Sequence, residues 1–179
     1  QSSQILFVIL GLITFLYAIP MGVKTPKNLR SIGGVKIYII ALVWAMATVV
    51  LPLLESQQTL VFDHWILVVQ RTFIVIVLML PFEIRDLDTD QLHLSTIPQK
   101  IGIPYTKIIG YAMLGDSILL ELFKQEFNQN RFLILIFSVA LLAVFLAKST
   151  KKKSRYYTAF WVESVPILVL ISVVVLTLI

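Results

Sequence analysis

Hydrophobic residues along this chain gather in long continuous runs that short polar segments separate. A helix needs about 20 mostly apolar residues to cross a hydrocarbon layer of about 30 Å, and six runs meet or approach that length. The runs lack the apolar–polar alternation of barrel strands, so we expect helices. The expected spans are residues 5–20, 35–54, 60–82, 101–123, 132–147 and 157–179. The pattern therefore predicts an all-α, polytopic transmembrane helix bundle that forms one domain over residues 1–179.

Composition supports this fold class. The chain is 58% hydrophobic and 14% charged, whereas a soluble domain is about half apolar and a quarter charged. The net charge of +5 comes from basic residues between the apolar runs, which is where residues that orient a membrane protein lie. We therefore expect membrane lipids as partners and no nucleic acid. The absence of cysteine excludes disulfides and thiolate chemistry.

The basic residues predict an orientation. The first and fifth connections between spans are strongly basic, and alternation places them on the same side of the membrane. The positive-inside rule makes that side cytoplasmic, with the third connection beside them. The basic residues of these two connections are Lys24, Lys27, Arg30, Lys148, Lys151, Lys152, Lys153 and Arg155.

A carboxylate cluster follows the third span. If the helix continues through it, Glu83, Asp86 and Asp90 share one face while Asp88 points elsewhere. Mg²⁺ typically takes one or two carboxylates and fills its other positions with water and substrate phosphates. Asp86 and Asp90 are therefore candidate Mg²⁺ ligands. The alternative interpretation is a solvated acidic loop that ends the span.

Two stretches resemble motifs of the UbiA family of intramembrane prenyltransferases. The stretch "RDLDTDQLHLSTIPQKIG" is similar to the second aspartate-rich motif of that family, and "FLYAIPMGVKTPKNLRSIGG" is similar to the loop after its fourth helix, with Ala18 in place of the usual Ser. The matching residues are Arg85, Asp86, Asp90, Thr96, Ile97, Pro98, Ile101 and Gly102 in the first stretch, and Tyr17, Pro20, Lys24, Lys27 and Arg30 in the second.

The resemblance implies a fold, a reaction and a set of site residues. The chain would correspond to helices four to nine of a nine-helix protein that moves a prenyl group from an isoprenoid diphosphate to a lipid-soluble acceptor. Asp86 and Asp90 would hold Mg²⁺, and Arg85 would contact phosphate or steady the carboxylates. The other substrate-binding residues would be Tyr17, Lys24, Lys27 and Arg30. No catalytic residue beyond this metal and diphosphate site is implied.

The other aspartate-rich motif of the family does not occur in this chain, which does not begin with Met. We therefore expect an N-terminally truncated part of a larger protein, inactive by itself, from the inner membrane of a bacterium, with the motif loops cytoplasmic. Two alternatives stay open. The first is a catalytically silent UbiA-like protein, and the second is a transporter of small solutes.

Three charged residues fall inside the expected spans: Arg71, Asp116 and Glu163. Such residues usually face the interior of a bundle and pair with one another. We therefore expect Arg71 to pair with the two carboxylates. The alternative is that one of the three lines a substrate cavity.

Overall fold

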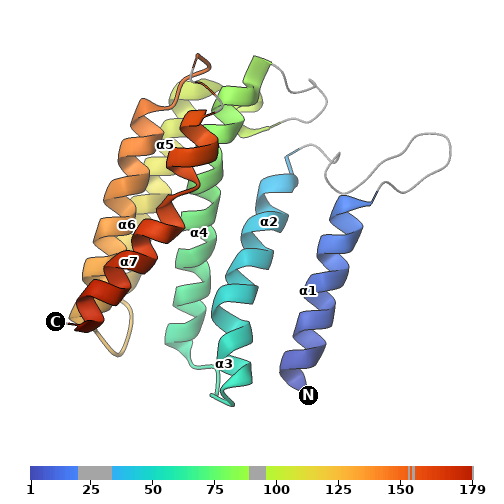
Figure 1. Cartoon of the computed structure of the whole chain (residues 1–179), viewed down its shortest axis with the longest axis vertical. Helices are drawn as coiled ribbons and strands as arrows, with labels where there is room; N and C mark the ends of the chain where they lie inside the picture. Colours follow the sequence, from blue (N-terminus) through green and yellow to red (C-terminus); the bar gives the residue numbers. More distant parts are fainter. Residues whose placement is uncertain (20–33, 89–95, 153, 155, 179) are drawn as a thin grey trace.

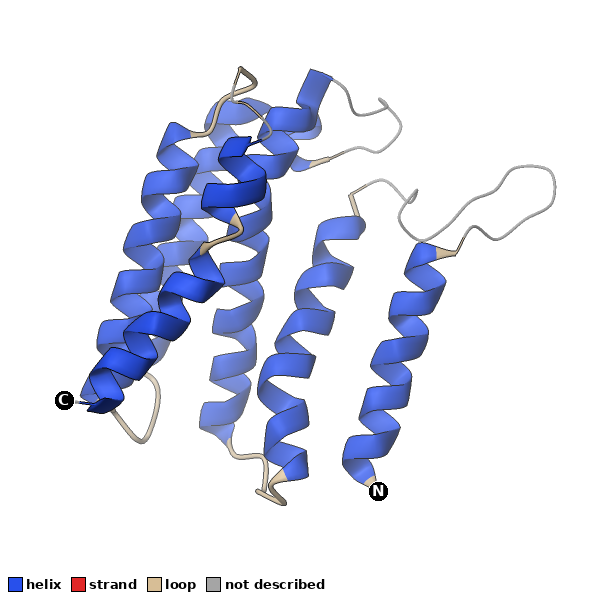
Figure 2. Cartoon of the chain, in the orientation of Figure 1, coloured by secondary structure: helices blue, strands red, loops and turns tan. Residues whose placement is uncertain are grey.

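The computed structural model describes residues 1–19, 34–88, 96–152, 154 and 156–178. All regular structure in these ranges is helical (Figure 2), which confirms the predicted all-α class. Six helical rods form close to the six predicted spans. Their elements are α1 (Ser2–Ala18); α2 (Lys36–Ala45), η2 (Met46–Val50) and α3 (Leu51–Glu55); α4 (Phe62–Arg85) and η3 (Asp86–Asp88); α5 (Ile97–Glu121); α6 (Gln129–Lys148); and η5 (Tyr157–Val162) and α7 (Val165–Leu178).

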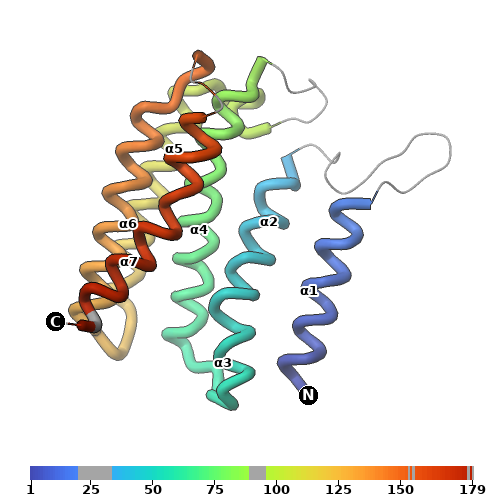
Figure 3. The backbone as a smooth tube through the Cα atoms, viewed as in Figure 1, coloured from blue at the N-terminus to red at the C-terminus, as the bar shows by residue number. Residues whose placement is uncertain are grey.

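Successive rods run in opposite directions. The C-terminal ends of α1, α4 and α6 lie at the end of the bundle where α2, α5 and η5 begin (Figure 1). The tube in Figure 3 passes through α2, η2 and α3 as one continuous rod, whereas the chain bends between η5 and α7. The alternation that the basic connections predicted is therefore present in the described helices.

Four of the rods are long and apolar enough to cross a membrane: Lys36–Glu55, Phe62–Asp88, Gln129–Lys148 and Tyr157–Leu176. These four segments indicate an integral membrane protein. Helix α1 is apolar but shorter, at 17 residues. Helix α5 has the required length, but Lys107, Asp116 and Glu121 interrupt its apolar sequence.

Helix α4 lies at the centre of the bundle and packs against α2, α5 and α6. Its side chains Val77, Leu80 and Ile84 are fully buried. Gly110 of α5 lets that helix approach α4 and α6 closely, because a Cβ atom there would lie 2.9 Å from Leu80 Cδ1 and 2.5 Å from Leu146 Cδ2. Both leucines are 0% exposed, so either side chain would have to change its conformation inside the packed core.

This contact gives a first prediction. Gly110→Ala should lower the free energy of unfolding by about 1–3 kcal/mol, because an added methyl overpacks the core. Gly115 lies on the same helix, and a methyl group added there would have nothing within 4 Å. Gly115→Ala should therefore be neutral or stabilise by about 0.5–1 kcal/mol, since alanine loses less backbone entropy than glycine. Thermal unfolding of both variants in the same detergent tests the pair, and equal effects would contradict the proposed packing.

Candidate functional site at one end of a membrane cavity

The carboxylate cluster begins where α4 ends. The α-helix stops at Arg85, and Asp86–Asp88 form one 3₁₀ turn, so the expected α-helical face does not continue from Glu83 to Asp86, and Asp90 lies outside the described residues. Arg85 donates to Asp86 through two parallel bonds, Nε to Oδ1 at 2.6 Å and Nη2 to Oδ2 at 2.7 Å. This bidentate geometry fixes the plane of the carboxylate. It agrees with the second of the two expected roles of Arg85, which was to steady the carboxylates.

Arg85 also joins α4 to the start of the last rod. Its Nη1 donates to Oγ1 of Thr158, a residue of η5 that is fully buried. The guanidinium carbon lies 5.7 Å from the ring centroid of Phe82, within the range of a cation–π contact. The Arg85 side chain is therefore held on three sides, and through it the orientation of Asp86 is fixed as well.

The neighbouring acidic residues have other partners. Glu83 is 4% exposed and accepts a hydrogen bond from the backbone N–H of Ile97 at 3.3 Å, which ties the end of α4 to the start of α5. Asp88 pairs with Lys151 at 2.6 Å on the exposed surface. Asp86 is thus distinguished from both neighbours, because it lines the large cavity described next.

A cavity of about 520 Å³ lies between α2 and the η5–α7 rod, with α4 as its floor. Along α4 the lining residues recur every three or four positions, from Arg71 through Leu78 and Phe82 to Asp86, so one stripe of the helix faces the cavity. Apolar side chains such as Trp44 and Val169 cover most of the wall. Its charged or hydroxylated lining residues are Lys36, Thr48, Arg71, Asp86, Ser138 and Glu163.

Polar groups thus mark both ends of an apolar space. Asp86 and Lys36 belong to elements that meet at one end of the bundle, where α4 stops and α2 begins. Arg71 lies about 22 Å from Asp86 along the axis of α4, at about 1.5 Å of rise per residue. Such an elongated cavity has the shape and chemistry to hold a long apolar chain with a charged head group at one end.

Two π-helical segments flank this cavity. Segment η2 carries Thr48, and η5 is followed directly by Glu163, both of which line the cavity. Single π-turns inside α-helices occur frequently at functional sites. They support this cavity as the functional site of the bundle.

The other predicted site residues have different outcomes. Asp90, Lys24, Lys27 and Arg30 lie outside the described residues, so their roles stay predictions. Tyr17 is half-buried at the end of α1 and is not among the described residues that line the cavity.

The residues of the stretch "RDLDTDQLHLSTIPQKIG" that follow residue 95 form the start of α5. Thr96 precedes this helix, Pro98 stands in its first turn, and Gly102 interrupts it with φ of 77°. This backbone conformation favours glycine. Thr96 Oγ1 is buried without a hydrogen-bond partner in the described part of the chain, so this turn has unused capacity for a polar contact.

The expected pairing of the three intramembrane charges is wrong. Arg71 forms no ion pair with any described residue, and neither do Asp116 and Glu163. Asp116 is exposed on α5, so it does not face the interior as expected. Arg71 and Glu163 both line the cavity; the alternative expectation, that one of the three lines a substrate cavity, stays a prediction.

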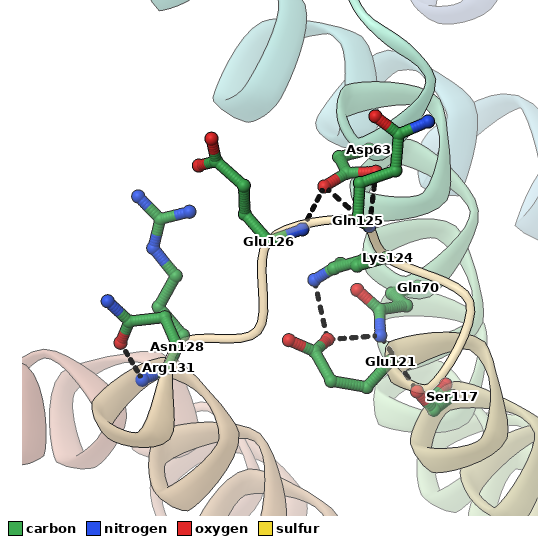
Figure 4. A network of polar contacts seen from close by, with 9 residues as sticks. All are labelled: Asp63, Gln70, Ser117, Glu121, Lys124, Gln125, Glu126, Asn128 and Arg131. Carbon is green, nitrogen blue, oxygen red and sulfur yellow. Dashed lines mark hydrogen bonds and ion pairs between the residues drawn. The ribbon is translucent and has the colours of Figure 1, made fainter.

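A second polar cluster, at the opposite end of the bundle, involves residues without a predicted role (Figure 4). Glu121 forms a buried ion pair with Lys124 and accepts a hydrogen bond from Gln70 Nε2 at 2.9 Å. The carboxylate of Asp63 accepts the backbone N–H groups of Gln125 and Glu126, at 3.1 Å each. These contacts explain how α5 carries a carboxylate next to an apolar core.

The structure also shows roles that the sequence did not suggest. Thr158 and Thr48 had no recognisable pattern, since their importance comes from neighbours on other helices. The sequence shows Lys36 as a basic residue at the start of a span, but it does not indicate that Lys36 lines the cavity. Lys107 has a structural role, because its Nζ donates to the carbonyl of Ala147 at 2.8 Å, near the end of α6.

No known protein-family model, curated protein or solved structure matches this chain.

Proposed function

We propose that this chain carries the diphosphate end and the lipid cavity of an intramembrane prenyltransferase of the UbiA type. One observation carries the proposal: Asp86, the first aspartate of the motif that resembles that family, lines one end of an elongated apolar cavity. A prenyl diphosphate combines a charged head with a long hydrocarbon chain. The cavity offers a charged end for the head and an apolar wall for the chain.

The donor set is suited to Mg²⁺. Asp86 supplies hard carboxylate oxygens, which Mg²⁺ prefers, and Arg85 uses one lone pair of each oxygen while holding the group in place. Asp86 and Asp90 would hold the ion, and among the described residues no cluster of three metal-ligating side chains occurs. When bound, Mg²⁺ would neutralise the charge that develops on the diphosphate.

The chain's own residues would then orient and protect the substrate. Lys36 stands at the same end of the cavity as Asp86 and can contact phosphate oxygens, with Lys24, Lys27 and Arg30 as further proposed contacts and Tyr17 as a proposed neighbour. The carbon–oxygen bond of the prenyl diphosphate breaks, and its electron pair leaves with the diphosphate. A nucleophilic atom of the acceptor bonds to the same carbon and loses its proton to solvent, while the apolar wall excludes water from the allylic cation.

The proposed location follows the same chemistry. The end of the bundle that holds Asp86 would face the cytoplasm of a bacterium, because α6 ends at Lys148 on that side and Lys151, which precedes Lys152, pairs with Asp88. A water-soluble prenyl diphosphate made in the cytosol reaches the cavity from that side.

The test uses the full-length protein in liposomes with radiolabelled prenyl diphosphates, an extract of lipid-soluble acceptors and Mg²⁺. We expect label to move into the lipid phase, and we expect chelation of Mg²⁺ with EDTA to abolish that transfer. Binding of prenyl diphosphate without transfer would favour the catalytically silent alternative.

A transporter is the second candidate, because Arg71 and Glu163 both line the cavity and charged residues within membrane spans often mark solute paths. The same liposomes test it. Uptake of small anions or cations that needs neither Mg²⁺ nor prenyl diphosphate would support transport and contradict prenyl transfer.

A further inference from the structure

Arg71 is charged, unlike the other described residues of α4 that line the cavity. It lies on the stripe of α4 that also carries Ile74, Val75 and Leu78. Its guanidinium has no ion pair or hydrogen bond to the described residues. The Cα–Cβ bond of a helical residue tilts towards the helix N-terminus, which for Arg71 is the direction away from Asp86. Arg71 therefore forms a polar boundary at the end of the apolar wall.

Thr48 stands across the cavity from this stripe, on α2's continuation η2. Its hydroxyl donates to the carbonyl of Trp44 at 2.7 Å, so its oxygen keeps acceptor capacity. Lys36, at the other end of the same rod, is about 18 Å from Thr48 by helical rise. Thr48 and Arg71 thus lie at similar distances from the end of the cavity where Lys36 and Asp86 stand. At about 20 Å from that end, polar side chains therefore line two walls of the cavity.

We infer that Arg71 sets the longest prenyl chain that the cavity accepts, an inference that rests on the proposed function. A chain that ends before Arg71 lies mainly against apolar side chains of α2, α4 and α7, with Ser138 and Glu163 as polar lining residues on the other walls. A longer chain must lay hydrocarbon against the guanidinium and displace the water or ions that solvate it. Because charged side chains lose favourable solvation when hydrocarbon covers them, the cavity penalises every chain that passes this residue.

The experiment compares prenyl diphosphates of increasing length, from geranyl through farnesyl and geranylgeranyl to longer polyprenyl diphosphates, on the full-length protein in liposomes. For the wild type we expect kcat/KM to fall about tenfold or more at the first chain whose extended length exceeds the separation of Asp86 and Arg71. This size of effect is that of one mismatched group in an enzyme pocket. Arg71→Leu should remove the fall, whereas Arg71→Lys should retain it.

Arg131→Leu is the matched control. It removes the same charge from the opposite end of the bundle, where Arg131 borders the polar cluster of Figure 4 and does not line the cavity. We expect the wild-type length profile from this variant. If Arg131→Leu moved the chain-length limit as far as Arg71→Leu does, the inference would be overturned, because the effect would then come from total charge.

Binding provides a second readout that does not depend on turnover. The chain has three tryptophans, of which Trp44 lines the cavity. With Trp65 and Trp161 replaced by Phe, the fluorescence of Trp44 reports the affinity of non-reactive prenyl thiolodiphosphates. The length limit should appear in these affinities and move to longer chains in Arg71→Leu.

The possible results separate the two proposals. If prenyl diphosphates bind and react but Arg71→Leu keeps the wild-type limit, the inference about Arg71 is wrong and the proposed function stands. If no prenyl diphosphate binds or reacts in the wild type, the proposed function fails and the inference fails with it.

Discussion

Replacement of Asp86 by Asn is expected to lower prenyl transfer by the full-length protein about a hundredfold or more. The change keeps the shape of the side chain but removes the charge that would hold Mg²⁺ against the diphosphate. Loss of one preorganised electrostatic contact to a developing charge typically costs a factor of about 10²–10³ in kcat. The measurement is kcat for radiolabel transfer at saturating Mg²⁺ and prenyl diphosphate.

Asp88 provides the control for this experiment. It lies in the same 3₁₀ turn, but its side chain is 66% exposed and pairs with Lys151. Asp88→Asn should change kcat less than about threefold, because exposed ion pairs contribute about 0–1 kcal/mol. Equal losses in the two variants would point to general disruption of the turn, and unchanged transfer in Asp86→Asn would reject the metal assignment.

The second large effect concerns stability at the opposite end of the bundle. Lys124→Met should lower the free energy of unfolding by about 3–5 kcal/mol, because it leaves the buried carboxylate of Glu121 without its counter-ion. The side chains of Lys124 and Glu121 are 6% and 3% exposed, so solvent would compensate only weakly for the missing charge. Unfolding in mixed micelles, followed by circular dichroism, gives the free energy.

Two further variants isolate the cause. Lys124→Met combined with Glu121→Leu should recover most of the loss, since both charges are then removed together. Lys151→Met breaks the exposed pair with Asp88 and should cost less than about 1 kcal/mol. A double variant as unstable as Lys124→Met alone would show that packing, and not the unpaired charge, causes the loss.

The number, limits and alternation of the helices could be predicted from the sequence because they depend on properties that a single chain carries. Long apolar runs form helices in lipid, because an α-helix pairs the backbone N–H and C=O groups of a segment with one another, and lipid offers them no other hydrogen-bond partner. The boundaries moved by a few residues where polar residues join a helix end, such as Gln129 in α6 and Gln99 and Lys100 in α5. Gly102, with its positive φ, marks where the first turn of α5 departs from the helix.

Partners across helices were less predictable. The spacing of Glu121 and Lys124 suits a pair within one turn, but nothing in the sequence links Gln70 to Glu121. The expected pairing of Arg71 with Asp116 is wrong. To predict such a pair, one must know how each helix is rotated about its own axis, and that rotation depends on packing between helices. Similarly, Asp86 could be predicted as a site residue from a local stretch of sequence. The contact that Arg85, its bidentate partner, makes with Thr158 could not, because Thr158 lies far along the chain.

The π-helical segment η2 determines the direction in which the far half of its rod presents side chains. Four residues of an α-helix turn about 40° more than a full circle. Side chains four residues apart therefore rotate gradually around the helix axis. The wider turn of η2, where the N–H of Leu51 reaches the carbonyl of Met46, winds the chain back. Lys36, Ile40 and Trp44 line the cavity from α2, before η2 begins, and Thr48 lines it from η2 itself. Deleting one residue from η2 would rotate the α3 segment by about 100° relative to α2, so the length of η2 sets which side chains of α3 face α1.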